Sequence, residues 1–192
     1  MKNIRIYIVF ASICLLSTNC AQAQEKYYYA FDEKIYLNEV PNKFVISFDK
    51  RYLLDIQDSL LKNAQVRHIE LKKENSCYIL TIENTNIKTL RKEFSQQVGI
   101  KSINPMYVIA DAALEMGVTD AIVVQFKENV SQQAINEIHK KYNVGVKEIS
   151  KYHQLLSIPI AFDPLEVANA YQTSGIVSKT TRPIFWQSIL FV

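Results

Sequence analysis

The sequence predicts an α+β protein: two tandem ferredoxin-like βαββαβ units, each an antiparallel sheet with helices on one face, after an N-terminal β-hairpin. Three observations lead to this prediction. Strand-like runs alternate with amphipathic runs of helical spacing, the order strand–helix–strand–strand–helix–strand occurs twice, and the two copies have equal spans. Phe48 and Pro105 are 57 positions apart, as are Phe126 and Pro183 (105 − 48 and 183 − 126). Duplication explains this agreement better than chance.

The first 23 residues have the pattern of a secretory signal peptide. A short basic start precedes an apolar run at 6–16, which is too short to span a bilayer because a spanning helix needs about 20 residues. Ala21-Gln22-Ala23 then supplies a small-x-small cleavage site. We therefore expect a secreted or periplasmic protein that is not membrane-bound after cleavage. Two alternatives stay open: an uncleaved anchor, and a lipoprotein modified at Cys20, where Asn19 is an unusual preceding residue.

Residues 24–41 are predicted to form the N-terminal hairpin. The β-prone runs 27–31 and 35–37 flank the polar segment Asp32-Glu33-Lys34, which can turn. The run contains three tyrosines, which could stack on a ligand, but strand packing is the commoner reason for such a run.

The first βαββαβ unit is predicted over residues 42–109. A strand at 44–48 leads into a helix, strands at 66–71 and 77–82 lead into a second helix, and a last strand covers 99–107. Apolar residues recur at helical spacing in both helices. They are Leu53, Ile56 and Leu60 in the first helix, and Ile87, Leu90 and Phe94 in the second.

A linker at 110–117 is predicted to lead into the second unit at 118–185, which an apolar C-terminal tail at 186–192 follows. The second unit repeats the order of the first. Its strands are expected at 121–126, 144–149, 154–160 and 175–185, and its helices carry Ile135, Ile138 and Tyr142, then Leu165, Ala168 and Tyr171.

The ends of the helices in the second unit have recognisable capping residues. Ser131 is a good N-cap for the first helix, and Asn143 can end it in a left-handed conformation. The second helix begins with Asp163 as cap and Pro164 in the first turn, and Glu166 is placed to close a capping box.

Charge and cysteine content narrow the functional classes. Removal of the signal leaves 20 Lys and Arg against 19 Asp and Glu, a net charge of +1, with no basic stripe for nucleic acid. Cys77 is then the only cysteine, so neither an internal disulfide nor a cysteine-based metal site is expected. Its strand-like neighbours favour a packed cysteine over a reactive thiol.

No catalytic residue, cofactor site or metal site is predicted. His68, His139 and His153 fall in different units without a shared spacing, so a structural role is expected for each. A phosphate-binding glycine loop, a nucleophile elbow and a paired-carboxylate motif are missing from the sequence.

Four stretches of the second unit carry a family resemblance. They are Ala121 to Lys127, Ile135 to Tyr142, Asp163 to Tyr171, and the turn Ser174-Gly175-Ile176-Val177. With the secretory signal and the tyrosine-rich hairpin, the chain resembles the N-terminal prodomain (propeptide) of bacterial subtilisin-like serine proteases, of the fervidolysin type. The resemblance covers essentially the whole mature chain and rests on packing motifs.

The resemblance implies a function and a partner. Such prodomains are intramolecular chaperones and temporary inhibitors that dock on the catalytic domain of their subtilisin-like protease through the open sheet face, with a tail in the substrate cleft. The tail here, from Val177 to Phe185, is one residue longer than usual and has Ile184 where asparagine is common. The Asp, His and Ser motifs of the protease do not occur, so the chain is not expected to be an enzyme. It could be a truncated gene product, a domain excerpt or a stand-alone inhibitor.

Strand alternation predicts which residues would meet a partner. If Ile122, Val124 and Phe126 face the helices, their neighbours face outward. A partly apolar open face suits docking. A secreted binding or adhesion module with the same fold, without any protease, is the alternative that this face fits equally well. The expected partner-binding residues are Val123, Gln125, Leu155, Ser157, Pro159, Pro183 and Phe185.

Overall fold

The computed structural model describes residues 25–30, 33–72, 76–83, 85–109, 114–150 and 153–178, and the backbone of 182–187. Within them, an antiparallel sheet of nine strands carries four α-helices, which confirms the predicted α+β class. The predicted signal peptide and the tail beyond residue 187 lie outside the described residues. The elements are β1 (Lys26–Ala30), β2 (Glu33–Phe48), a short 3₁₀ helix (Lys50–Tyr52), α1 (Leu53–Lys62), β3 (Val66–Lys72), β4 (Cys77–Ile82), α2 (Ile87–Phe94), β5 (Ile100–Ile109), β6 (Glu115–Val124), α3 (Gln132–Tyr142), β7 (Gly145–Ile149), β8 (Gln154–Ser157), α4 (Pro164–Thr173) and β9 (Arg182–Gln187).

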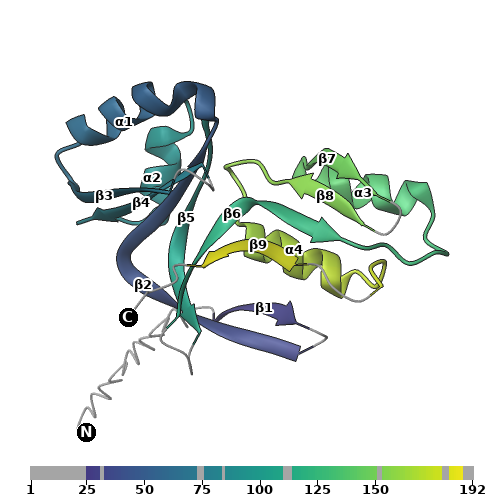
Figure 1. Ribbon diagram of the computed structural model, residues 1–192. Coiled ribbons are helices and arrows are strands. Elements are labelled where there is room, and N and C mark those ends of the chain that lie inside the picture. The colour runs from purple at the N-terminus through teal and green to yellow at the C-terminus, as the bar shows by residue number, and fades with distance from the viewer. Residues whose placement is uncertain are drawn as a thin grey trace, which may run out of the picture.

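The strand order divides the sheet into two halves. The first half has the order β3-β4-β2-β5, and the second has the order β9-β6-β8-β7. The two halves join where β5 pairs with β6, from Met106 opposite Gly117 to Val108 opposite Glu115. Figure 1 shows α1 and α2 with the first half and α3 and α4 with the second, at opposite ends of the molecule.

The strand register repeats along the chain. In the first half Phe44 of β2 pairs with Pro105 of β5, and in the second half Ile122 of β6 pairs with Pro183 of β9. Each residue of the second pair lies 78 positions after its counterpart (122 − 44 and 183 − 105). The equal spans in the sequence therefore correspond to equivalent pairings in the sheet.

Two strands extend further toward the N-terminus than the sequence predicts. β2 is continuous over 16 residues, so it joins the expected hairpin to the first strand of the first half. Its register against β5 shifts between Glu39 and Phe44, where Pro41 has no N–H to donate and Asn42 has a φ of 59°. β6 begins at Glu115, inside the expected linker, because its first residues pair with both β5 and β9.

Each half has its own hydrophobic core between the sheet and its two helices. Alternate strand residues face the helices, as the period of two requires. The first core contains Phe44, Ile46, Phe48, Tyr78, Leu80, Ile82 and Ile103 from strands, with Ile56, Leu60, Leu90 and Phe94 from α1 and α2. The second contains Ile122, Val124, Leu156 and Ile158 with Val167, Ala168 and Tyr171 of α4, and Ile138 and Tyr142 of α3 pack against it.

The local capping predictions can be checked in the second half. The Ser131 hydroxyl accepts a hydrogen bond from the Ala134 N–H at 3.2 Å, and Asn143 is left-handed at φ 50° and ψ 40°, both as predicted. The Asp163 carboxylate accepts from the Leu165 N–H at 2.9 Å. Glu166 differs from the prediction, since its carboxylate accepts from the Lys26 ammonium of β1 at 2.8 Å instead of closing a capping box.

Candidate docking face

The second half places a row of residues across the sheet face opposite its helices. Glu148 of β7 pairs with Leu155 of β8, Leu155 pairs with Val123 of β6, and Val123 pairs with Arg182 of β9. Val123 and Leu155 are partly exposed, whereas Glu148 is exposed. We call this sheet face, centred on Val123 and Leu155, the docking face. Two apolar side chains thus lie at its centre, with a carboxylate on the edge strand.

Gln125 lies at one end of the docking face. Its side chain is exposed, and it lines a groove of about 520 Å³ together with residues 126–130 and Ser178. The Ser178 N–H donates to the Gln125 carbonyl at 2.8 Å, which holds the chain after α4 beside the end of β6. Gln125 therefore contributes to a concave surface beside the end of β6.

Ser157 and Pro159 lie at the other end of β8. Both are partly exposed. The Ser157 hydroxyl donates to the Gly145 carbonyl at 3.2 Å, so it supports the pairing of β8 with the edge strand β7. The Pro159 carbonyl accepts from the Phe162 N–H at 3.0 Å in the turn before α4. These two hydrogen bonds hold the backbone at the end of β8, which forms the rim of the docking face on this side.

The sheet register separates Pro183 and Phe185 from the Val123–Leu155 row. Pro183 pairs with Ile122, and Phe185 pairs with Val118; both partners are fully buried. The backbone from Arg182 to Gln187 is the strand β9, so residues 182–185 of the segment expected as a tail are part of the sheet.

The sequence analysis did not predict Glu148 as part of the docking face. The pairing of β7 with β8 shifts between Val146 and Glu148, and this irregularity breaks the simple alternation on which the prediction relied. Lys147, between them, forms an ion pair with Asp120 of β6 at 2.6 Å. The adjacent charged residues Lys147 and Glu148 were the available signal in the sequence, because edge strands commonly carry charges.

The same face is closed in the first half. Val45 pairs with Ile79 there, as Val123 pairs with Leu155 in the second half. Val45 is 0% exposed and Ile79 is 2% exposed, whereas Val123 and Leu155 are both partly exposed. The two halves therefore share a pairing pattern but differ in which face can be reached from solvent.

The histidines do not gather in one place. His68 is exposed on β3 opposite Thr81, and His153 is exposed before β8. His139 of α3 packs beside the rings of Phe126 and Tyr171, each with its centroid 6.0 Å from that of the imidazole. Burial lowers the pKa of His139, which favours the neutral ring in the folded protein.

Cys77 is buried on β4, and burial raises the pKa of its thiol to about 11. In the described part of the chain, no three His, Cys, Asp or Glu side chains come together as a metal site. None of the helices in that part has the length and apolar character needed to span a membrane.

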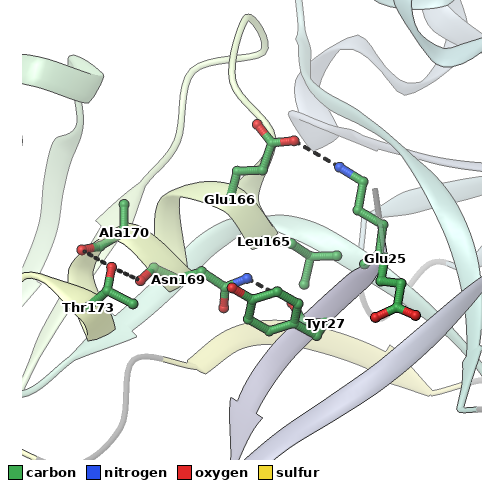
Figure 2. Close-up of a pocket in the computed structure, with 8 residues that line it drawn as sticks. Glu25, Tyr27, Leu165, Glu166, Asn169, Ala170 and Thr173 are labelled. Atoms are coloured by element: carbon green, nitrogen blue, oxygen red, sulfur yellow. Dashed lines mark hydrogen bonds and ion pairs between the residues drawn. The ribbon is translucent and has the colours of Figure 1, made fainter. Parts of the chain in front are cut away.

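A pocket of about 250 Å³ lies where β1 meets α4 (Figure 2). At one end Lys26 forms ion pairs with Asp163 at 2.9 Å and Glu166 at 2.8 Å. At the other end the Asn169 amide donates to the Tyr27 carbonyl at 2.8 Å. Because these polar groups already bind one another, the pocket marks a contact between the N-terminal hairpin and the second half.

Comparison of the sequence with models of known protein families and with curated proteins finds no match.

Proposed function

We propose that the chain is an exported, non-catalytic docking protein of the subtilisin-prodomain type. In this proposal residues 1–23 are its signal peptide, and residues 42–109 and 118–185 are two ferredoxin-like units. The strand orders β3-β4-β2-β5 and β9-β6-β8-β7 and the two helices on one face of each half support the second statement. The resemblance of the second unit to subtilase prodomains supports the class of partner.

One observation favours docking through the second unit. Its central pair, Val123 and Leu155, is partly exposed, while the equivalent pair of the first unit, Val45 and Ile79, is buried. A face of four strands can supply the roughly 800 Å² per partner of a standard interface. An apolar centre with a charged rim is the usual anatomy of such an interface.

The tail is expected to contribute little to binding. β9 pairs with β6 from Arg182 to Gln187, so Pro183 and Phe185 have partners within the sheet. Entry of this segment into a protease cleft would require those backbone hydrogen bonds to break. We therefore expect detectable binding to a protease with weak inhibition.

The test is titration calorimetry against a bacterial subtilisin whose nucleophilic serine is replaced by alanine. Leu155→Asp should weaken binding by about 1–3 kcal/mol, because it places a charge at the centre of the interface. Phe185→Ala should weaken it less. Leu54→Asp is the matched control, since Leu54 lies on α1 and is 73% exposed, and it should leave binding unchanged.

Two outcomes would contradict the proposal. Loss of binding in Phe185→Ala with no change in Leu155→Asp would mean that the tail docks instead of the face. Absence of binding to any subtilisin-like protease would favour the alternative, a secreted binding or adhesion module without a protease.

A further inference from the structure

β7 is the end strand of the second half, and its outer edge has no strand partner among the described residues. The strand order of the sheet ends at β7, which pairs with β8 alone (Figure 1). All five residues of β7 are exposed. The backbone N–H and C=O groups along such an edge can pair with another strand, so natural proteins usually block it with charges, proline or a covering segment.

Two large apolar side chains are exposed on β7. Val146 is 46% exposed and Ile149 is 70% exposed. The corresponding end strand of the first half, β3, differs from β7. Its three apolar residues are all partly buried, and its Arg67 forms an ion pair with Glu83 of the same chain at 2.9 Å. β7 is therefore the end strand at which pairing would remove more apolar surface from water.

The bulge in β7 brings these two side chains to one face of the sheet. Val146 pairs with Leu156, and Ile149 pairs with Gln154. Leu156 and Gln154 are two positions apart on β8, so they face the same side, and so do their partners. In a regular strand, residues three positions apart would face opposite sides. Val146 and Ile149 can therefore both contact the same face of a second strand.

The segment from Val146 to Ile149 is suited to pairing with itself. It reads valine, lysine, glutamate, isoleucine. Two copies that pair antiparallel, centred between Lys147 and Glu148, place these opposite charges across from each other twice. The same register places Val146 across from Ile149 twice. Apolar pairs and opposite charges directly across two strands both stabilise the pairing.

The neighbouring registers do not have this match. A shift by one residue centres the pairing on Lys147 or on Glu148, and each choice places two like charges directly across from each other, which is destabilising. The charged side chains are also available. Glu148 is exposed and takes part in no ion pair among the described residues. The Lys147 ammonium has three N–H donors, so it can bind a second carboxylate beside that of Asp120, 2.6 Å away.

We propose that two copies of this chain pair through β7 and form a symmetric dimer with one continuous sheet. The two-fold axis is perpendicular to the sheet, so the docking faces of both copies lie on the same side of it. Pairing over four residues buries less area than a standard interface, which makes the dimer weak and dependent on concentration. The proposal does not depend on which partner the docking face binds.

The test is sedimentation velocity of the full-length protein over a series of concentrations. The weight-average sedimentation coefficient of the parent should rise toward that of a dimer. Lys147→Glu and Glu148→Lys each place like charges across the two-fold axis, so each should weaken association on the order of tenfold. Lys140→Glu is the matched control, because it makes the same change of charge at an exposed position of α3, and it should associate like the parent.

An equimolar mixture of Lys147→Glu and Glu148→Lys separates pairing from damage to the fold. In the mixture opposite charges again lie across from each other at both positions, so it should associate about as strongly as the parent. Mixing cannot restore the Asp120 ion pair that Lys147→Glu loses. A mixture no stronger in association than its components, a parent that stays monomeric at every concentration, or an equal effect of Lys140→Glu would each overturn the proposal.

Disulfide formation tests the register without changing a charge. In full-length protein carrying Cys14→Ser and Cys20→Ser, Cys77 is buried, so Val146→Cys and Ile149→Cys each add one accessible thiol. In the proposed register these two positions of opposite copies are about 5 Å apart between Cβ atoms, whereas each lies roughly 10 Å along the strand from its own equivalent. A mixture of the two variants should therefore cross-link faster than either alone. Equal rates would show that the strands do not pair in this register and overturn the proposal.

Discussion

Two glycines in equivalent turns differ in the space that their surroundings leave for a side chain. Gly99 and Gly175 occupy the same place in the two halves, between the second helix and the last strand, and both have positive φ, 93° and 77°. Their surroundings differ. A Cβ on Gly99 would lie 2.5 Å from the Cβ of Tyr52, whereas a Cβ on Gly175 would meet nothing within 4 Å.

Gly99→Ala should therefore be the more destabilising of two matched substitutions. Both variants place a Cβ on a residue with positive φ, and this backbone strain costs about 1–2 kcal/mol. Gly99→Ala also collides with an atom fixed to the backbone of Tyr52, and this adds a further ~1–3 kcal/mol, as for overpacking. Urea unfolding of both variants measures the difference. Equal losses of unfolding free energy would show that the Tyr52 contact relaxes freely.

The sequence could indicate the turn at Gly99 but not its contact. Glycine after a helix is a local signal that depends on backbone conformation alone. The neighbour Tyr52 is the last residue of the 3₁₀ helix before α1, and only the fold brings it against Gly99. The docking-face residues show the same difference. Alternation along β6 and β8 predicts that Val123 and Leu155 face away from the helices, whereas the irregular pairing of β7 with β8 follows from the fold, so Glu148 was not predicted.

At the scale of elements, the packing of α3 on α4 depends on an uncharged imidazole. His139 of α3 lies beside Phe126 and beside Tyr171 of α4, and its Nε2 is buried without a hydrogen-bond partner among the described residues. Burial lowers its pKa from the usual value of about 6.5. The unfolded chain therefore takes up a proton at this position more readily than the folded protein does.

Acidification should destabilise the protein through His139. Above about pH 6.5 the imidazole is neutral in both states and contributes no pH dependence; as the pH falls below that value, protonation of the unfolded chain lowers the free energy of unfolding. The loss stops growing once the pH is below the lowered folded pKa. His139→Phe should flatten this part of the curve, and His153→Asn, at an exposed position, should not. Unfolding by urea between pH 7.5 and 5 is the measurement, and an unchanged slope in His139→Phe would contradict it.

Local signals predicted the elements better than the contacts between them. The Ser131 cap, the Asn143 end and the Asp163 cap depend on neighbours within a few residues, and all three are present. The role of Glu166 depends on Lys26, 140 positions away, and the continuous strand β2 depends on pairing with both β1 and β5. Contacts over such separations leave no periodic pattern in the sequence.

At the scale of the whole molecule, a third hydrophobic cluster joins the two halves. It combines strand residues of the first half with strand and helix residues of the second: Leu37, Tyr107, Met116, Val118 and Leu165. Burial, with the nearby Asp163 charge, raises the pKa of Tyr107, so its hydroxyl stays neutral within this cluster. The Lys26–Asp163 ion pair and the Asn169–Tyr27 hydrogen bond, the second drawn in Figure 2, join β1 to the helix that carries Leu165 and to its cap. A unit of about 70 residues is marginal alone, which makes such a junction important for stability.

Leu165→Ala should weaken the coupling between the halves as well as the overall stability. Leu165 is 1% exposed at the start of α4, and loss of a buried leucine side chain costs about 2–5 kcal/mol. Two probes can follow the halves separately during urea unfolding: fluorescence of Trp186, the only tryptophan, on β9, and the reactivity of Cys77 on β4, with Cys14 and Cys20 replaced by serine. In the parent protein the two transitions should coincide, as in cooperative unfolding.

In Leu165→Ala the two transitions should separate, because the cluster that transmits unfolding between the halves is broken. Leu54→Ala is the control: Leu54 lies on the outer surface of α1, is 73% exposed, and should change stability by no more than about 0.5 kcal/mol without separating the transitions. If Leu165→Ala lowers stability but both probes still report one midpoint, the halves are coupled through the β5–β6 pairing and not through this cluster. Weakening that pairing would then be the change that separates the transitions.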